Sequence, residues 1–396
     1  MRPPVTHRAP GKLLIAGEYA VLEPGQPSIV VAVDRFVTVT ASTPLDGEVV
    51  LDTDLLPHEV RMSRSPTGLR PLDPVHAPHV DGALTHLMSV MEVLDQLTRQ
   101  LALPPVPVRL SVRSGLHEHG TKIGLGSSGA VTVAAVSALA RFYGLPLSPH
   151  EQFRLALLAS IRVDPGPSGV DLAASTWGGW TIYRAPDRDR LLRSLRRDGV
   201  TTTLHATWPG LTVRALPAPT ALRLYAGWSG SPASTSARVR GLSRTTWWHS
   251  TDHDRFLHQS ARTVTSAACA LEHDDPAALL AAVHRARHLL ALLDERTGLG
   301  IFTPRLSALC HAAQACGGAG KPSGAGGGDC GIALLPHTTD PHSLRTRWAA
   351  DGITALPLRV TDLPGTEGPG ADVAGPDLTP GPLLSPSAPT HRGEPR

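Results

Sequence analysis

The sequence predicts an α+β fold in two parts. A chain of 396 residues is longer than one hydrophobic core usually organises, so two domains are expected. Segments with the alternation of β-strands and segments with the apolar spacing of helices occur in both halves. A variable, charged stretch separates the halves. The predicted organisation is an N-terminal domain over 1–186, a connecting segment over 187–220, a C-terminal domain over 221–363 and a tail over 364–396.

The N-terminal half is expected to mix strands with helices. Residues 28–42 read as two strands joined tightly at Asp34 and Arg35, because β-branched residues alternate on either side of that polar pair. Leucine and methionine recur at helical spacing over 81–101, and the mostly apolar stretch 128–143 indicates a helix buried on most sides. Also expected are a strand over 9–19, a surface loop over 63–80, a strand over 106–113, a helix over 152–161 and a strand over 180–183.

The C-terminal half is expected to begin with a strand at 222–230 and to continue mainly with helices. Apolar periodicity predicts helices over 252–273, 276–294 and 303–316, and the last of these leads into a glycine-rich loop and a strand at 330–335. Beyond about residue 363 proline and glycine are abundant and aromatic residues are absent. Such a composition cannot bury enough apolar surface to fold, so the tail is expected to be disordered.

Composition excludes several classes of protein. The formal net charge is only +3 and no basic run is present, so no nucleic-acid or membrane-surface partner is expected. No apolar run is long enough to span a bilayer, and the N-terminus lacks the pattern of a secretory signal. The four cysteines lack the spacing of a metal site and read as reduced thiols, which places the protein in the cytoplasm. A monomer or a homodimer fits equally well.

Lysine is rare in this chain. Of its 37 basic side chains other than histidine, only Lys12, Lys122 and Lys321 are lysines, and each lies in or beside a glycine-rich segment. A lysine ammonium is a compact point charge, whereas the arginine guanidinium is a planar fork. The placement of the three lysines is either a coincidence or a requirement. Because the chain otherwise uses arginine, we expect that the smaller charge is needed at these places.

The strongest local motif is KIGLGSSG at 122–129, which leads directly into the helix predicted at 128–143. Glycines allow backbone N–H groups to converge on an anion, and the helix N-terminus adds its positive end. Serine hydroxyls are ligands for Mg²⁺ or partners of a phosphate oxygen. The motif therefore predicts a phosphate-binding loop made by Gly124, Leu125, Gly126, Ser127, Ser128 and Gly129, with Ser128 as a candidate Mg²⁺ ligand.

Two other nucleotide-binding motifs fit this loop less well. It lacks the spacing of a Walker A motif, and the Gly-x-Gly-x-x-Gly of dinucleotide-binding folds should follow a strand directly. Here a polar loop intervenes after Arg113, and Glu151, at the distance of the expected ribose-binding acid, begins a helix instead. A purely structural glycine turn remains as the alternative.

Three weaker segments accompany this loop. GKPSGAGGGD at 320–329 precedes a strand, which favours an ordered glycine loop over a flexible linker. APGKLLIAGEY at 9–19 is a strand that stops at a turn carrying Glu18 and Tyr19. In PSGVD at 167–171 a glycine turn presents Asp171, although a lone aspartate in such a place is more often a helix cap.

Together these segments resemble the three motifs of the GHMP kinase superfamily, in the same order, over residues 8 to about 360. Within it the sequence is most similar to the phosphomevalonate kinases. The similarity rests on the lysine before GLGSSG, on KPSGAGGGDCGIAL and on GWSGSPASTS at 227–236. Mevalonate kinases usually lack Asp329 in the third motif. The resemblance implies a ribosomal-protein-S5-like N-terminal domain and a ferredoxin-like C-terminal domain.

The resemblance also implies an activity and a set of site residues. The activity is transfer of the terminal phosphoryl group of ATP to (R)-5-phosphomevalonate, with Mg²⁺ as cofactor. Lys12, Asp171 and Lys122 would lie at the transfer site. The acceptor would be contacted by Ser231, Ser234, Ser323, Gly324, Ala325 and Tyr19.

Elementary chemistry agrees with this assignment. Two anions must be brought within bonding distance, so lysines and Mg²⁺ are needed to offset their repulsion. A phosphate monoester has a second pKa of about 6 and hardly needs a general base, so Asp171 is expected to orient Lys12 or to complete the Mg²⁺ shell. The alternatives are a mevalonate kinase or another small-molecule kinase of the superfamily, and a catalytically dead ATP-binding regulator.

Overall fold

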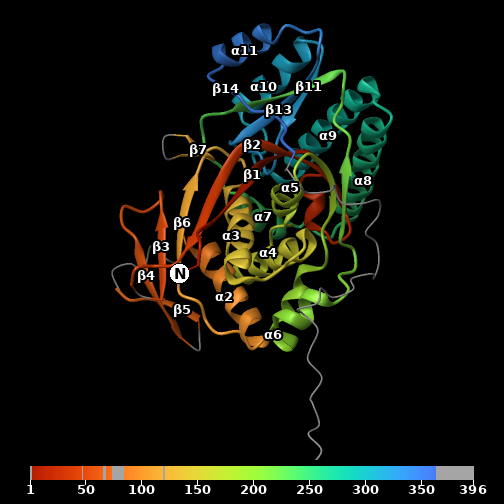
Figure 1. The fold of residues 1–396 in the computed structure, drawn as a ribbon. Helices are drawn as coiled ribbons and strands as arrows, with labels where there is room; N and C mark the ends of the chain where they lie inside the picture. The colour runs from red at the N-terminus through yellow and green to blue at the C-terminus, as the bar shows by residue number, and fades with distance from the viewer. Residues whose placement is uncertain (1, 47, 66–67, 74–83, 119–120, 363–396) are drawn as a thin grey trace, which may run out of the picture.

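A mixed sheet of eight strands dominates the N-terminal half of the computed structural model, which describes residues 2–46, 48–65, 68–73, 84–118 and 121–362 (Figure 1). The order is β10-β9-β2-β6-β3-β4-β5, and β1 pairs with β2 beside this path. Among the described strand pairs of this sheet, only β3 and β6 run parallel. The strands are β1 (Val5–Ala16), β2 (Pro27–Ser42), β3 (Val49–Thr53), β4 (Val60–Ser65), β5 (Gly68–Pro71), β6 (Val108–Ser114), β9 (Trp180–Arg184) and β10 (Thr212–Leu216).

The prediction of two strands over 28–42 is wrong, because β2 is one continuous strand. Its pairing with β1 passes from Pro10–Phe36 to Gly11–Val33, so Asp34 and Arg35 are extra residues in a bulge. A bulge accommodates polar residues without ending the strand. The polar pair that looked like a turn therefore marks this irregularity.

The described residues of this half form five helices, namely α2 (Thr85–Gln100), α3 (Ser127–Tyr143), α4 (Pro149–Val163), α5 (Val170–Trp177) and α6 (Arg188–His205). Helices α2, α3 and α5 contact the sheet, and α4 and α6 pack on other helices of this group. The helix α3 contacts β1, β2, α2, α4 and α5 and is buried along nearly its whole length, as its apolar composition predicts. It ends at Gly144, whose φ of 80° is the left-handed conformation that favours glycine at a helix C-terminus. The candidate phosphate loop thus leads into a helix that is largely buried.

Two further expectations need correction. Part of the segment predicted as a surface loop over 63–80 forms the hairpin of β4 and β5, which aligns Met62 with Pro71; the rest of that segment lies largely outside the described residues. The segment 187–220, expected to connect the domains, contains α6 and β10. Strand β10 pairs with β9 and α6 contacts α2 and α4, so most of this segment belongs to the N-terminal half.

The C-terminal half is a four-stranded antiparallel sheet with helices. Its order is β12-β13-β11-β14, with β11 between β13 and β14. The strands are β11 (Leu222–Trp228), β12 (Ala319–Pro322), β13 (Cys330–Pro336) and β14 (Thr354–Leu356). The helices are α7 (Thr235–Ser243), α8 (Thr251–Glu272), α9 (Pro276–Thr297), α10 (Pro304–Ala315) and α11 (Pro341–Ala350).

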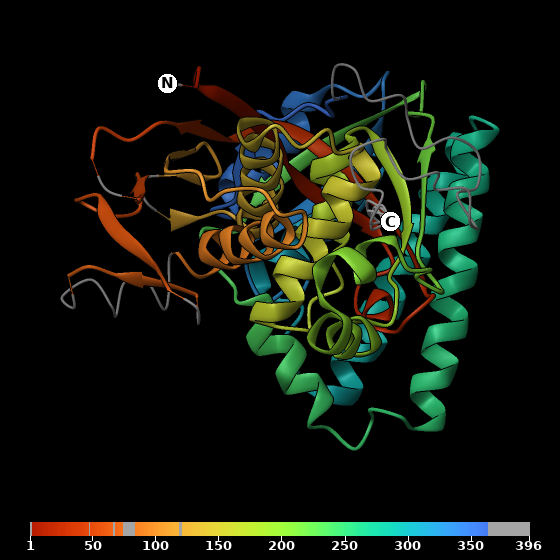
Figure 2. The ribbon, with the colours of Figure 1, turned by 60° about the horizontal axis from the view of Figure 1, so that its bottom comes forward.

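The two halves share one hydrophobic core. A single cluster of buried side chains runs from β1 and β2 through α3 to Val264, Ile332 and Leu334 of the C-terminal half. Figure 2 shows β3–β5 at one side of the molecule and the long helices α8 and α9 at the other, with the remaining helices between them. Among the described residues no helix is long and apolar enough to cross a membrane. The predicted disordered tail lies outside the described residues.

Candidate active site

Lys12 lies on β1 in the first motif (9–19), directly against the second motif, which is the glycine segment 122–129. Its backbone N–H donates to the carbonyl of Leu125 at 2.8 Å, and its Nζ donates to the carbonyl of Gly124 at 3.3 Å. A Cβ at Gly126 would approach Cγ of Lys12 to 2.9 Å. The strand therefore delivers the ammonium to the loop that the sequence predicted to bind phosphate.

The second glycine segment ends at the N-terminus of α3. Gly124 and Gly126 have φ values of 80° and 76°, which glycine adopts without strain. Gly126 is the N-cap, no side chain caps the helix, and Ser127 and Ser128 form its first turn, which has no acidic residue. The first N–H groups of the helix are thus left to other partners and carry its positive end, which suits an anion.

Asp171 lies against the same turn as Lys12. It occupies the first turn of α5, whose N-cap is Gly169, so it is not the cap. A Cβ at Gly129 would be 2.5 Å from its Oδ2, and one at Gly126 would be 3.4 Å from its Cβ. Lys12 and Asp171 thus both contact the turn at Gly126.

The third motif is the glycine segment 320–329, and its residues 323–329 form the third loop, between β12 and β13. This loop packs against the second glycine segment. A Cβ at Gly124 would be 2.4 Å from Cβ of Asp329, and one at Gly324 would be 3.7 Å from Nζ of Lys12. Asp329 itself has a φ of 53°, an uncommon value for a residue other than glycine. The three motifs, far apart in sequence, therefore meet around Lys12.

Three contacts fasten the first motif to the third. Oγ of Ser323 accepts from the N–H of Leu14 at 2.8 Å and donates to its carbonyl at 3.2 Å. The hydroxyl of Tyr19 donates to the carbonyl of Ala325 at 2.6 Å. Lys321 donates to Glu18 in a fully buried ion pair. These contacts fix the turn after β1 to the start of the third loop.

The contacts show what two of the predicted residues do within the protein. Ser323 is buried and its hydroxyl is occupied by backbone groups of β1. Lys321 is also buried and pairs with Glu18, so among the three lysines it is the one committed to the protein interior. An acceptor contact by Ser323 stays a prediction.

The segment with Ser231 and Ser234 lies beside Asp329. The carbonyl of Ser231 accepts from the N–H of Asp329 at 2.7 Å, and Oδ1 of Asp329 accepts from the N–H of Ala233 at 2.9 Å. Oγ of Ser234 accepts from the N–H of Ala237 and caps α7. The segment is therefore at the site, whereas contact of either hydroxyl with an acceptor stays a prediction.

Cations surround Asp329. Burial raises the pKa of this carboxyl, while its hydrogen bond from Ala233 and the charges of Lys12, Arg238 and Lys122 act in the opposite direction. Lys122 itself is exposed on the short strand β8 (Thr121–Lys122), which pairs with β7 (His117–Glu118). Its charge also contributes to lowering the pKa of His86, where burial is the main cause and Asp171 opposes it.

Sequence reasoning did not assign Asp329, Arg238 and His86 to the site. Asp329 had a visible signal in the sequence, because it ends a run of glycines, but it served only to distinguish one branch of the family from another. Arg238 and His86 had none, because nothing local separates them from the many other arginines and histidines of the chain.

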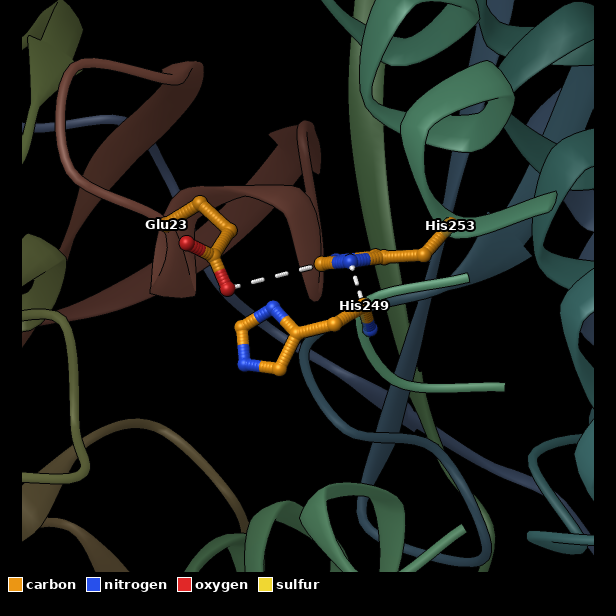
Figure 3. A group of neighbouring side chains, drawn as sticks. All are labelled: Glu23, His249 and His253. Atoms are coloured by element: carbon orange, nitrogen blue, oxygen red, sulfur yellow. Dashed lines mark hydrogen bonds and ion pairs between the residues drawn. The ribbon is translucent and has the colours of Figure 1, made fainter. Parts of the chain in front are cut away.

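A second cluster, outside the motifs, joins Glu23, His249 and His253 (Figure 3). The N–H of His249 donates to Nδ1 of His253 at 3.2 Å, so a neutral ring carries its proton on Nε2, which is 4.0 Å from Oε1 of Glu23. Burial lowers the pKa of His253, which agrees with a neutral ring. A metal would need the lone pair of the protonated nitrogen. The cluster therefore does not fit a metal ion.

Comparison with known proteins agrees with this geometry. The GHMP kinases N terminal domain matches residues 87–179, and the GHMP kinases C terminal domain matches residues 267–354. The chain is 51% identical, over 89% of its length and 96% of the relative's, to phosphomevalonate kinase from a Streptomyces species. The chain belongs to the GHMP kinases.

Two more relatives define its position within that family. Streptococcus pneumoniae phosphomevalonate kinase, solved in complex with phosphomevalonate and AMPPNP, superimposes with a TM-score of 0.77 at 27% identity, covering 90% of this chain and all of that one. Mevalonate kinase from Thermococcus sibiricus is 27% identical over 83% of this chain and 88% of its own length. The far higher identity to the Streptomyces enzyme places the chain in the phosphomevalonate kinase branch, among ATP-dependent phosphotransferases.

Proposed function

We propose that this protein transfers the γ-phosphoryl group of ATP to (R)-5-phosphomevalonate, giving ADP and 5-diphosphomevalonate. The observation that carries the proposal is the convergence of Lys12, the helix N-terminus at Gly126 and the third glycine loop on one point. The choice of 5-phosphomevalonate as the acceptor rests on the similarity of nearly the whole chain to a phosphomevalonate kinase.

In this proposal the second glycine segment holds the ATP phosphates. Backbone N–H groups of the first turn of α3 donate to them, and Lys12 and Lys122 offset their charge. An oxygen of the acceptor phosphate attacks the γ-phosphorus. The bond from that phosphorus to the bridging oxygen breaks in line with the attack, and ADP leaves with the electron pair. No proton need be removed from a dianionic acceptor, so Asp171 is a positioning residue.

The residues present also fit Mg²⁺. Oδ2 of Asp171 lies against the backbone at Gly129, next to Ser128, so a carboxylate and a hydroxyl adjoin the phosphate loop. Oxygen ligands of this kind, together with phosphate oxygens, are those that Mg²⁺ prefers. When bound, the ion would neutralise charge on the transferred group, and Ser128 and Asp171 would hold it.

The proposal is tested by an ADP-release assay with a panel of acceptors. ADP is expected with 5-phosphomevalonate and only at background level with mevalonate, whose alcohol would require a base. Release of ADP with mevalonate but not with 5-phosphomevalonate would make the chain a mevalonate kinase. If no acceptor of the panel gives ADP, the result favours a catalytically dead ATP-binding regulator.

Two variants test the role of Asp171. Lys12→Ala is expected to abolish turnover, and Asp171→Asn to retain more activity than Lys12→Ala, because a carboxamide still positions its neighbours. If Asp171→Asn is equally inactive, and the wild-type rate follows a single basic group with pH, Asp171 is a general base instead.

A further inference from the structure

The proposed acceptor is anionic at both ends, and the lysines account for only one of them. Lys12 adjoins Gly324, the first glycine of the third loop. The phosphate of the acceptor must come to this end, because the γ-phosphoryl group is transferred there. The carboxylate at the other end of the molecule then needs its own cation.

Arg238 lies at the other end of the same loop. Its guanidinium lies over Gly327, where a Cβ would be 1.5 Å from Nη2 and 1.8 Å from Cζ. Glycine is therefore required at this position for the arginine to lie where it does. Lys12 and Arg238 thus mark the two ends of the loop that contains Ala325.

The protein orients Arg238 without neutralising it. Nη1 donates to the carbonyls of Leu299 and of Gly300, the latter at 3.3 Å, and Nε is buried without a hydrogen-bond partner. Within the part of the chain that the structure describes, no carboxylate forms an ion pair with it. A partly buried cation that is held by two carbonyls and has no carboxylate in ion-pair contact is costly in the free protein.

The charge of Arg238 is felt by the neighbouring motif residues. Burial raises the pKa of Tyr19 and of Asp329, and the charge of Arg238 acts to lower both. At Asp329 the charge of Lys12 acts in the same direction as that of Arg238. Tyr19 is hydrogen bonded to Ala325, between the two ends of the loop. Arg238 therefore belongs electrostatically to the site although it comes from α7, outside the three motifs.

We propose that Arg238 binds the carboxylate of the acceptor, so that the acceptor spans the third glycine loop with its phosphate at Lys12 and its carboxylate at Arg238. This inference rests on the proposed function. The planar guanidinium suits a carboxylate, to which it can donate two parallel hydrogen bonds. The reaction then selects acceptors of one length as well as of one charge.

The test compares the acceptor with its primary amide, which has the same shape but no negative charge at that end. KM is measured for both acceptors and for ATP in the wild type and in Arg238→Ala. The variant is expected to raise KM for 5-phosphomevalonate about 10- to 100-fold, as loss of a charged hydrogen bond does, and to change KM for the amide and for ATP by less than about twofold.

Two further variants serve as controls. Arg244→Ala removes an exposed arginine at the end of α7 and should leave all three KM values unchanged. Arg238→Lys keeps the charge without the fork and should have an intermediate effect on 5-phosphomevalonate alone. Should Arg238→Ala fail to fold, as shown by its thermal unfolding, Arg238→Gln replaces it with the same expectation.

The outcomes separate this inference from the proposed function. Equal losses with both acceptors, or a raised KM for ATP, would show that Arg238 only shapes the loop and would overturn the inference while leaving the function intact. Absence of turnover of 5-phosphomevalonate by the wild type would overturn the function itself, whatever Arg238 does.

Discussion

At the scale of single residues, the site depends on three glycines, because they have no side chain. Gly124, Gly126 and Gly129 each leave room for a side chain of another motif, namely Asp329, Lys12 and Asp171. The first two also have positive φ. Gly129 has no such backbone requirement, so only the approach of Asp171 explains why a side chain is excluded there.

Gly129→Ala tests that explanation. The new Cβ would be 2.5 Å from Oδ2 of Asp171, so the carboxylate must move. Because small displacements of positioning groups have large effects on rate, kcat is expected to fall about 10- to 100-fold. Gly241→Ala is the control, since its Cβ would meet nothing closer than 3.6 Å. Unchanged kcat in Gly129→Ala would show that Asp171 tolerates displacement.

At the scale of elements, the strand β1 joins the two sheets. It pairs with β2 along its length, and its end and the turn that follows reach the third loop through Leu14, Glu18 and Tyr19. The ion pair of Glu18 with Lys321 is the most deeply buried of these links. Removal of the charge of one partner would leave the charge of the other isolated in the interior.

Lys321→Met is therefore expected to destabilise the fold by about 3–5 kcal/mol, measured by urea unfolding. The double variant Glu18→Gln with Lys321→Met should recover part of this loss, because the orphaned carboxylate is gone. Arg61→Ala, which breaks an exposed pair with Asp46, should leave the free energy of unfolding almost unchanged. An equally small loss in Lys321→Met would mean that Glu18 finds another partner.

Local patterns predicted most helices and the glycine loops, because apolar spacing and glycine runs report on their own segment. The helix predicted at 128–143 is α3, which begins one residue earlier, at Ser127. Tertiary partners decided the errors. Asp34 and Arg35 resemble a turn until β1 is alongside, and the segment 187–220 resembles a linker until β9 pairs with β10. Arg238 was missed for the same reason, since only the fold brings α7 over Gly327.

At the scale of the whole molecule, the burial and reactivity of the cysteines indicate how tightly the two halves are joined. Cys330 is fully buried, and its Sγ donates to the carbonyl of Ile123 at 2.8 Å, across the junction of the second and third motifs. Burial raises its pKa above the usual thiol range, and raises that of Cys310 to about 11. Cys269, in contrast, is exposed.

In the native protein at neutral pH, Cys269 is therefore expected to react with a maleimide at least about 100-fold faster than Cys310 and Cys330, because burial raises the pKa of those two thiols and shields them from the reagent. Peptide mass spectrometry over a time course measures this, with Cys269→Ser as the control for the fast phase. Addition of ATP should slow labelling of Cys330 further, because a ligand that holds the two loops together disfavours opening. Rapid labelling of Cys330 without ATP would mean that the junction opens readily.

The link between Glu18 and Lys321 also has a consequence for biosynthesis. The two residues are 303 positions apart, and Leu14 and Ser323 are 309 apart. At roughly 5–20 residues per second, a ribosome needs about 15–60 s to add 300 residues. Throughout that interval the emerging chain carries a carboxylate destined for the interior without the ammonium that makes its burial tolerable. The N-terminal half can collapse around its sheet meanwhile, but the proposed site of phosphoryl transfer is completed only when the third loop has been synthesised.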